Sequence, residues 1–116
     1  MPQLGMQGPM KLVPSEIDRA VPHKTPGNFA LGYIKETVPR AFIPTFVGRA
    51  DSDLNRTLKE LDSDAEWFKW RVARNAREAW NVQCKNFHDF WETGHLDMDE
   101  HPEPPKGTGW KCPVCE

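Results

Sequence analysis

The chain has 116 residues and a formal net charge of -2, with 15 Lys and Arg against 17 Asp and Glu. This length fits one small domain with a modest core, and the weakly acidic balance excludes a uniformly basic nucleic-acid coat. No stretch is long and apolar enough to span a membrane, and proline and glycine interrupt the start too often for a signal peptide. Three cysteines are an odd number for a secreted disulfide scaffold, so we expect a cytoplasmic or intracellular protein with no membrane partner.

Residues 1–26 hold five of the eleven prolines and show no sustained hydrophobic period. Such a segment is typical of a chain end that is extended or flexible. We therefore expect residues 1–26 to form a proline-rich arm, either disordered or laid along a partner. Residues 27–116 are expected to form the folded domain.

Two short apolar runs follow, in residues 28–34 and 41–48, with a polar stretch between them. This pattern predicts an antiparallel pair of strands. Pro44 inside the second run indicates an edge position or a bulge, because proline cannot donate a hydrogen bond to a neighbouring strand.

The rest of the chain predicts a helix, a strand and a longer helix. Leu54, Leu58 and Leu61 recur at helical spacing, residues 66–74 alternate apolar and basic side chains, and residues 75–91 carry an apolar stripe. The order strand, strand, helix, strand, helix predicts an α+β fold. In this fold, helices flank a small mixed or antiparallel sheet of three strands.

The three cysteines belong to two pairs of candidate metal ligands. Cys84 and His88 are four residues apart on the predicted last helix, and Cys112 and Cys115 form a Cys-x2-Cys turn. Two such pairs meet the tetrahedral four-ligand demand of structural zinc. Four protein ligands leave no place for a water nucleophile, so the sequence predicts a C-terminal tail stapled by zinc, without chemistry at the metal.

Other interpretations of these residues stay open. A lone Cys-x2-Cys can be a redox pair, although such pairs usually open a helix in a βαβ unit and this one lies in an irregular tail. Cys84 and His88 can also be unligated core residues on an amphipathic stripe. His101 is the main rival of His88 for the histidine position, and His95 is a weaker one.

The order of the predicted elements and several short motifs resemble the GIY-YIG nuclease superfamily. "GNF" at 27–29 stands where that family has its first signature, and "FVG" at 46–48 stands where the second signature closes the second strand. The stretches "FVGRADSDLNRTLKEL" and "AREAWNVQCKNFHDF" look like the passage into the family's first helix and like its second helix. The resemblance covers residues 22–116 and includes the "WKCPVC"-like tail of a bacterial and phage branch.

The resemblance implies an active site whose groups are largely missing here. Both signature tyrosines, the first of which is thought to take the proton in phosphodiester cleavage, are replaced by Phe29 and Phe46. The arginine that steadies the phosphate corresponds to Arg56 or, one residue on, to Thr57. The glutamate that holds the divalent ion corresponds to Gln83. These changes keep side-chain volume but delete the proton acceptor and an anionic ligand of magnesium.

The sequence therefore predicts a catalytically impaired GIY-YIG-like domain that acts as a binding module. One candidate partner is DNA, because basic residues can meet phosphates, and Trp67 and Trp70 can stack on bases if they are exposed. The alternative is a solvated, charged strand edge with both tryptophans in the core. The basic residues are Arg49, Arg56, Lys69, Arg71, Arg74 and Arg77. The other candidate is a protein held by residues 1–26, in an interaction or assembly role.

The alternative function is an active, magnesium-dependent DNA endonuclease with a non-standard residue set. In that case Tyr33, the only tyrosine, supplies the missing hydroxyl. It lies four residues after Phe29 and therefore on the same face of an extended strand.

Overall fold

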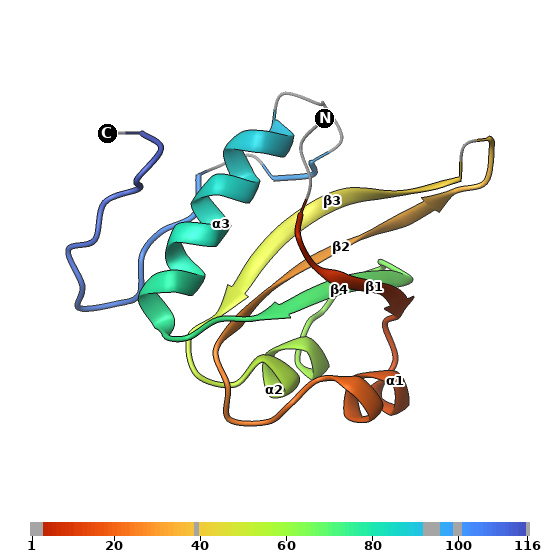
Figure 1. Cartoon of the computed structure of the whole chain (residues 1–116), viewed down its shortest axis with the longest axis horizontal. Helices are drawn as coiled ribbons and strands as arrows, with labels where there is room; N and C mark the ends of the chain where they lie inside the picture. Colours follow the sequence, from red (N-terminus) through yellow and green to blue (C-terminus); the bar gives the residue numbers. More distant parts are fainter. Residues whose placement is uncertain (1–3, 39, 92–95, 99–100, 116) are drawn as a thin grey trace.

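The computed structural model describes residues 4–38, 40–91, 96–98 and 101–115, and Figure 1 shows their arrangement. The elements in chain order are β1 (Gln7–Lys11), α1 (Pro14–Ala20), β2 (Gly27–Lys35), β3 (Ala41–Ala50), α2 (Leu54–Lys59), β4 (Trp67–Val72) and α3 (Ala76–Trp91). Helices α1 and α2 lie on one side of the sheet and α3 lies on the other (Figure 1). The expected α+β class is confirmed. Among the described residues, no helix has the length and apolar character needed to cross a membrane.

The sheet has four antiparallel strands in the order β1-β4-β2-β3. The prediction of a three-stranded sheet was wrong by one strand: β2, β3 and β4 were expected, and β1 was not. β1 lacks the usual alternation because Gly8, at φ 108°, and Pro9 interrupt it, and only Met10 is partly buried. Pairing with β4, a strand about 60 residues away in the sequence, defines β1 instead.

Residues 14–20 form α1, which begins with Pro14 in its first turn, where a missing backbone N–H costs nothing. Ile17 and Val21 are almost completely buried in the core shared by α1, α2 and the sheet. The side-chain amide of Asn55 in α2 donates to the carbonyl oxygen of Val21 over 2.9 Å and ties the two helices together. The expectation of an extended or flexible arm was therefore wrong for residues 7–21, and the folded domain begins before residue 27.

The two faces of the sheet carry separate cores because side chains alternate along each strand. Phe29 and Leu31 of β2 belong to the core on the side of α1 and α2. Ala30 of β2 and Val47 of β3 pack against Phe87 of α3 on the other side. This alternation decides which side chains can meet in one site.

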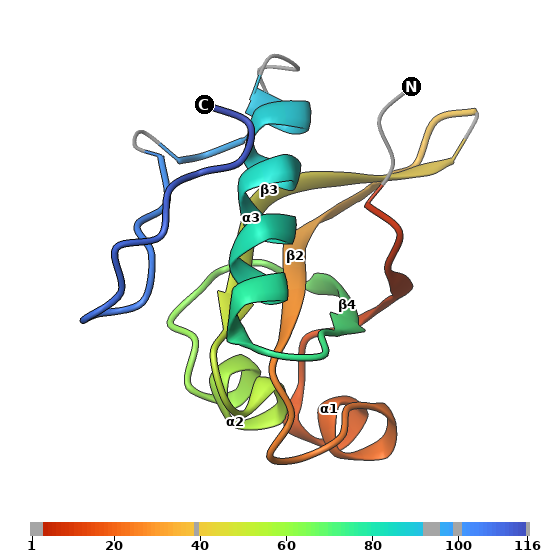
Figure 2. The same cartoon turned by 60° about the vertical axis from the view of Figure 1, so that its left-hand side comes forward.

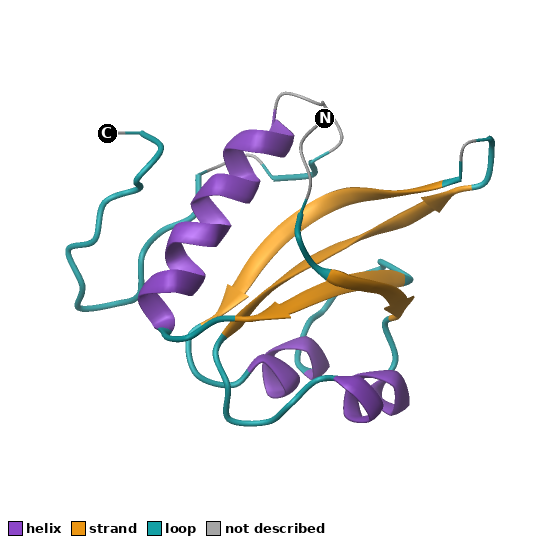
Figure 3. Ribbon diagram, in the orientation of Figure 1, coloured by secondary structure: helices purple, strands orange, loops and turns teal. Residues whose placement is uncertain are grey.

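The hairpin of β2 and β3 extends beyond β4 and β1 (Figure 3). β3 is an edge strand, and its pairing with β2 shifts register where Leu31 and Gly32 lie opposite Phe46 and Pro44. The expectation of an edge position or a bulge at Pro44 is confirmed.

The C-terminal segment, residues 101–115, runs beside α3 (Figure 2). Helix α3 begins after Asn75, whose side-chain oxygen accepts a hydrogen bond of 2.8 Å from the backbone N–H of Glu78. The indole N–H of Trp80, in the second turn, donates to the carbonyl oxygen of Lys111 over 3.2 Å. This hydrogen bond joins the irregular segment to the helix next to the cysteines.

Candidate metal centre

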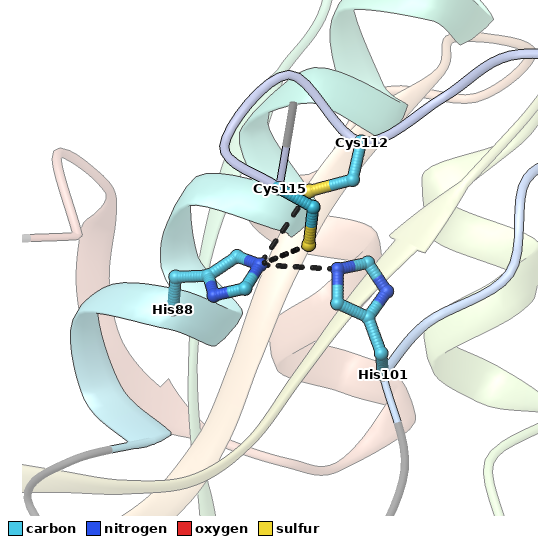
Figure 4. Close-up of side chains that lie close together, drawn as sticks. All are labelled: His88, His101, Cys112 and Cys115. Atoms are coloured by element: carbon cyan, nitrogen blue, oxygen red, sulfur yellow. Dashed lines mark hydrogen bonds between the residues drawn. The ribbon is translucent and has the colours of Figure 1, made fainter.

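Four potential metal ligands from three segments of the chain meet beside α3 (Figure 4). His88 comes from the last turn of α3, His101 from the following loop, and Cys112 and Cys115 from the "CPVC" turn. One nitrogen or sulfur atom of each lies within 4.8 Å of the others. The Nε2 atom of His88 lies 3.1 Å from Nε2 of His101, 3.5 Å from Sγ of Cys112 and 3.2 Å from Sγ of Cys115.

The three separations from Nε2 of His88 are close to those between neighbouring ligands of one tetrahedral ion. Zinc bonds of about 2.0–2.1 Å to nitrogen and about 2.3 Å to sulfur place two nitrogens about 3.3 Å apart, and nitrogen and sulfur about 3.5 Å apart. The Nδ1 atom of His101 lies 2.7 Å from the carbonyl oxygen of Pro102. A carbonyl only accepts, so Nδ1 carries the proton and Nε2 presents its lone pair to the cluster. The cluster can hold a metal ion, and its ligands are compatible with zinc.

Three of the four ligands expected from the sequence, His88, Cys112 and Cys115, belong to this cluster, whereas the fourth member is His101 and not Cys84. Cys84 is completely buried and packs with Trp80 and Cys112 next to the cluster. Spacing along a helix correctly indicated that Cys84 and His88 are neighbours. It carries no information on where the following loop places His101. His95 lies outside the described residues.

The thiols at this site differ in acidity. Burial opposes ionisation of Cys112, but hydrogen bonds from the backbone N–H of Cys115 and from the thiol of Cys84 outweigh it and lower the pKa of Cys112 to about 6. Burial, followed by the hydrogen bond to Cys112, raises the pKa of Cys84. Cys112 is therefore a thiolate near neutral pH, the form that binds metals, while Cys84 remains a neutral thiol.

The positions that the resemblance assigns to a nuclease active site do not converge. The rings of Phe29 and Phe46 stack with centroids 6.1 Å apart on the side of α1 and α2, and Phe29 is only 2% exposed. Gln83 lies in α3 on the opposite side, where its side-chain oxygen accepts a hydrogen bond of 2.5 Å from Arg49. The sheet therefore separates Gln83 from the two phenylalanines.

The two other candidates from the nuclease resemblance, Arg56 and Tyr33, lie on the surface. Arg56 forms an ion pair of 3.0 Å with Glu60. Tyr33 is 47% exposed and lines a cavity of about 600 Å³ beside the β2–β3 hairpin. The acidic residues that line the same cavity are Glu36, Asp62, Asp64, Glu66 and Asp97. Their negative potential opposes the approach of a phosphodiester to Tyr33.

Most of the basic residues expected to contact DNA are engaged with other side chains. The ion pairs are Arg49–Asp51, Arg56–Glu60, Arg71–Glu78 and Arg74–Glu78. The ammonium group of Lys69 lies 5.5 Å from the ring centroid of Phe42. Trp70 is buried and Trp67 is half-buried. Along β4 these contacts leave little positive charge or aromatic surface for a polyanion.

Comparison of the chain with protein-family models, with curated proteins and with solved structures found no match in any of the three. Three features of the chain itself bear on function. They are the His/Cys cluster, the stacked rings of Phe29 and Phe46, and the charges on the surface around α3.

Proposed function

We propose that the protein is a zinc-stapled domain with a GIY-YIG-like fold that binds nucleic acid without cutting it. The observation that carries the zinc assignment is the convergence of two imidazole nitrogens and two sulfurs within 4.8 Å of one another. Two histidines and two cysteines are a typical ligand set of structural zinc. With four protein ligands, the ion holds the C-terminal segment on α3 and leaves no position for a reacting water.

Loss of catalysis is proposed from the side chains at the positions that resemble a nuclease active site. Phe29 and Phe46 have no hydroxyl that can accept a proton, and Phe29 is buried. Gln83 is neutral and already bound to Arg49, whereas magnesium favours carboxylate and water oxygens. The order β2, β3, α2, β4, α3 is the order of elements on which the resemblance rests.

Nucleic acid is the partner that the observations favour. A protein partner was expected along a free arm of residues 1–26, but β1 and α1 take residues 7–20 into the sheet and the core. Contacts with phosphate need cations without an acidic partner. Arg77, Lys106 and Lys111 are exposed and form no ion pair within the part of the chain that the structure describes.

The test uses the purified full chain in three measurements. Elemental mass spectrometry should find about one zinc per chain, and chelation should lower the melting temperature. Fluorescence anisotropy with labelled linear and branched DNA should show binding that weakens between 50 and 200 mM salt, about as expected for a few phosphate contacts. Plasmid incubated with magnesium or manganese should stay intact. A folded protein that contains no zinc would contradict the structural zinc site. Absent or salt-independent binding would contradict nucleic acid as the partner. A cut plasmid would contradict the loss of catalysis.

One observation supports the second candidate function, a metal-dependent endonuclease. Tyr33 is the only tyrosine, and its side chain is half-exposed beside a cavity. If the plasmid is cut, a Tyr33→Phe variant decides whether this hydroxyl is responsible. Cleavage that survives the substitution would remove Tyr33 from the mechanism.

A further inference from the structure

A second surface lies next to the metal cluster, where Arg77 in the first turn of α3 contacts Trp110 of the C-terminal segment. We define this tail surface by Arg77 of α3 and by Trp110 and Lys111 of the segment. The guanidinium carbon of Arg77 lies 5.3 Å from the ring centroid of Trp110, within the range of a cation–π contact. The carbonyl oxygen of Lys111 is held by the indole N–H of Trp80. Packing and hydrogen bonding therefore fix the backbone that carries the aromatic ring and the lysine.

A cavity of about 400 Å³ opens beside the tail surface. Its walls are mainly aromatic rings and prolines, from Trp80, Trp110, Pro102 and Pro104, with Lys111 at the edge. This volume falls in the range of small-molecule sites, and flat apolar walls suit a planar ring. The cavity also touches the metal cluster through His101, Cys112 and Cys115.

Among the Asp, Glu, Lys and Arg residues that the structure describes, the one that lines this cavity is a cation, Lys111. Arg77 and Lys111 are exposed and form no ion pair with another described residue, and Lys106 lies on the turn of the same segment. Glu103 is the one acidic residue between positions 101 and 115, and it does not line the cavity. Arg74, three residues before Arg77, is paired with Glu78 and adds little positive charge. An aromatic cavity with Lys111 in its lining, and with Arg77 over the ring of Trp110, fits a ligand that is planar and anionic.

We propose that the tail surface binds single-stranded nucleic acid, with a base stacked against Trp110 in the cavity and the adjoining phosphates paired with Arg77 and Lys111. Aromatic side chains stack on every base, and lysine or arginine neutralises phosphate, so this combination recognises single strands with little sequence preference. A duplex fits less well, because its bases already stack on one another and offer no free ring face. This proposal names the surface and the form of nucleic acid for the binding role proposed above, and it rests on that role.

The surface depends on the metal cluster. Cys112 follows Lys111 directly, and Trp110 packs against the group of Trp80, Cys84 and Cys112. Release of the ion would remove the link through Cys112 and Cys115 and leave the Trp80 hydrogen bond and the packing of Trp110 to hold the segment on α3. Single-strand binding should therefore fall when zinc is removed, even where the sheet and its cores stay folded.

The experiment measures fluorescence anisotropy of a labelled 15-nucleotide oligodeoxythymidine with the zinc-loaded full chain. Wild-type protein should bind with a slope of log affinity against log salt of roughly -1.4 for two phosphate contacts. Lys111→Gln should lower affinity and reduce the slope by about 0.7. Trp110→Leu should lower affinity by roughly 5- to 150-fold, the cost of one lost stack. The matched control is Lys35→Gln, which removes one exposed lysine at the last residue of β2 and should leave the affinity unchanged.

Each outcome separates the surface from the broader role. Zinc content and circular dichroism show whether each variant is folded. If Trp110→Leu does not fold, the affinity and salt dependence of Lys111→Gln test the proposal. If Lys111→Gln and Lys35→Gln reduce the affinity equally, or if neither reduces it, the tail surface is not the binding site. Nucleic-acid binding by another part of the protein then remains. Binding of duplex alone overturns the single-strand assignment. Absence of binding to any oligonucleotide at 50 mM salt overturns both proposals.

Discussion

The ring of Phe29 in β2 lies directly over Gly48 of β3, its partner across the strand pair. A Cβ atom on Gly48 would come within 2.4 Å of Cζ of Phe29. The two residues belong to the "GNF" and "FVG" motifs, so the motifs that resemble nuclease signatures pack against each other here. Their contact places the Phe29 ring in the core, next to Phe46.

Gly48→Ala should destabilise the domain by about 1–3 kcal/mol, because the added methyl group overlaps a buried ring that has little room to move. Urea unfolding measures the change. Gly109→Ala is the matched control, since a Cβ at that glycine meets nothing within 4 Å. If Gly48→Ala lowers the free energy of unfolding no more than Gly109→Ala does, the Phe29 ring can move to accommodate the methyl group.

Replacing His101 should remove zinc, whereas replacing Cys84 should not. His101→Ala leaves three ligands and an open position, so zinc content after dialysis should fall well below one per chain. Cys84→Ala removes a buried thiol beside Cys112 and should keep about one zinc, with a modest loss of stability from the small cavity. Zinc retained by His101→Ala and lost from Cys84→Ala would restore the ligand set expected from the sequence.

Ile17→Ala should destabilise the protein by about 2–5 kcal/mol, because the side chain is 1% exposed in the core between α1, α2 and the sheet. Val13→Ala, at a side chain 39% exposed just before α1, is the control and should cost about 0.5 kcal/mol or less. Thermal unfolding followed by circular dichroism distinguishes the two. Equal, small effects would mean that the first 26 residues behave as an arm.

Stability in acid should depend on Glu78, at the start of α3. The side chain and the backbone N–H of Arg74 donate to the Glu78 carboxylate over 2.7 and 3.1 Å, which lowers its pKa from the usual 4.5. A lowered pKa stabilises the folded state above about pH 4.5, and this contribution is lost as pH falls through the folded value. Glu78→Gln should therefore lower the melting temperature at pH 6, and the difference from wild type should shrink towards pH 3.

The control for this titration is Glu103→Gln, an exposed glutamate in the C-terminal segment. Its melting temperature should follow the wild-type curve at every pH. A Glu78→Gln difference that stays constant between pH 6 and pH 3 would contradict the role assigned to the charge.

Local patterns predicted the middle of the fold well. The apolar run of residues 28–34 located β2, which is buried on both faces of the sheet over most of its length. Alternation in residues 66–74 located β4, because one of its faces is more deeply buried than the other. The apolar stripe of residues 75–91 located α3 to within one residue at its start. β1 could not be found in this way, because its backbone pairs with β4 while its side chains mostly face solvent. α1, only seven residues long, has one buried side chain, Ile17, which is too few to produce a period.

The sequence by itself determined that three cysteines and a histidine are available as candidate metal ligands in two close pairs, and that phenylalanine stands at positions 29 and 46 and glutamine at position 83. These facts concern residue identity and short spacing, which do not depend on folding. Only the tertiary structure decided that His101 joins the cluster while Cys84 remains beside it, and that the sheet lies between Gln83 and Phe29. Such choices depend on the path of a loop and on the face of a strand, and both are set by contacts between residues far apart in the chain.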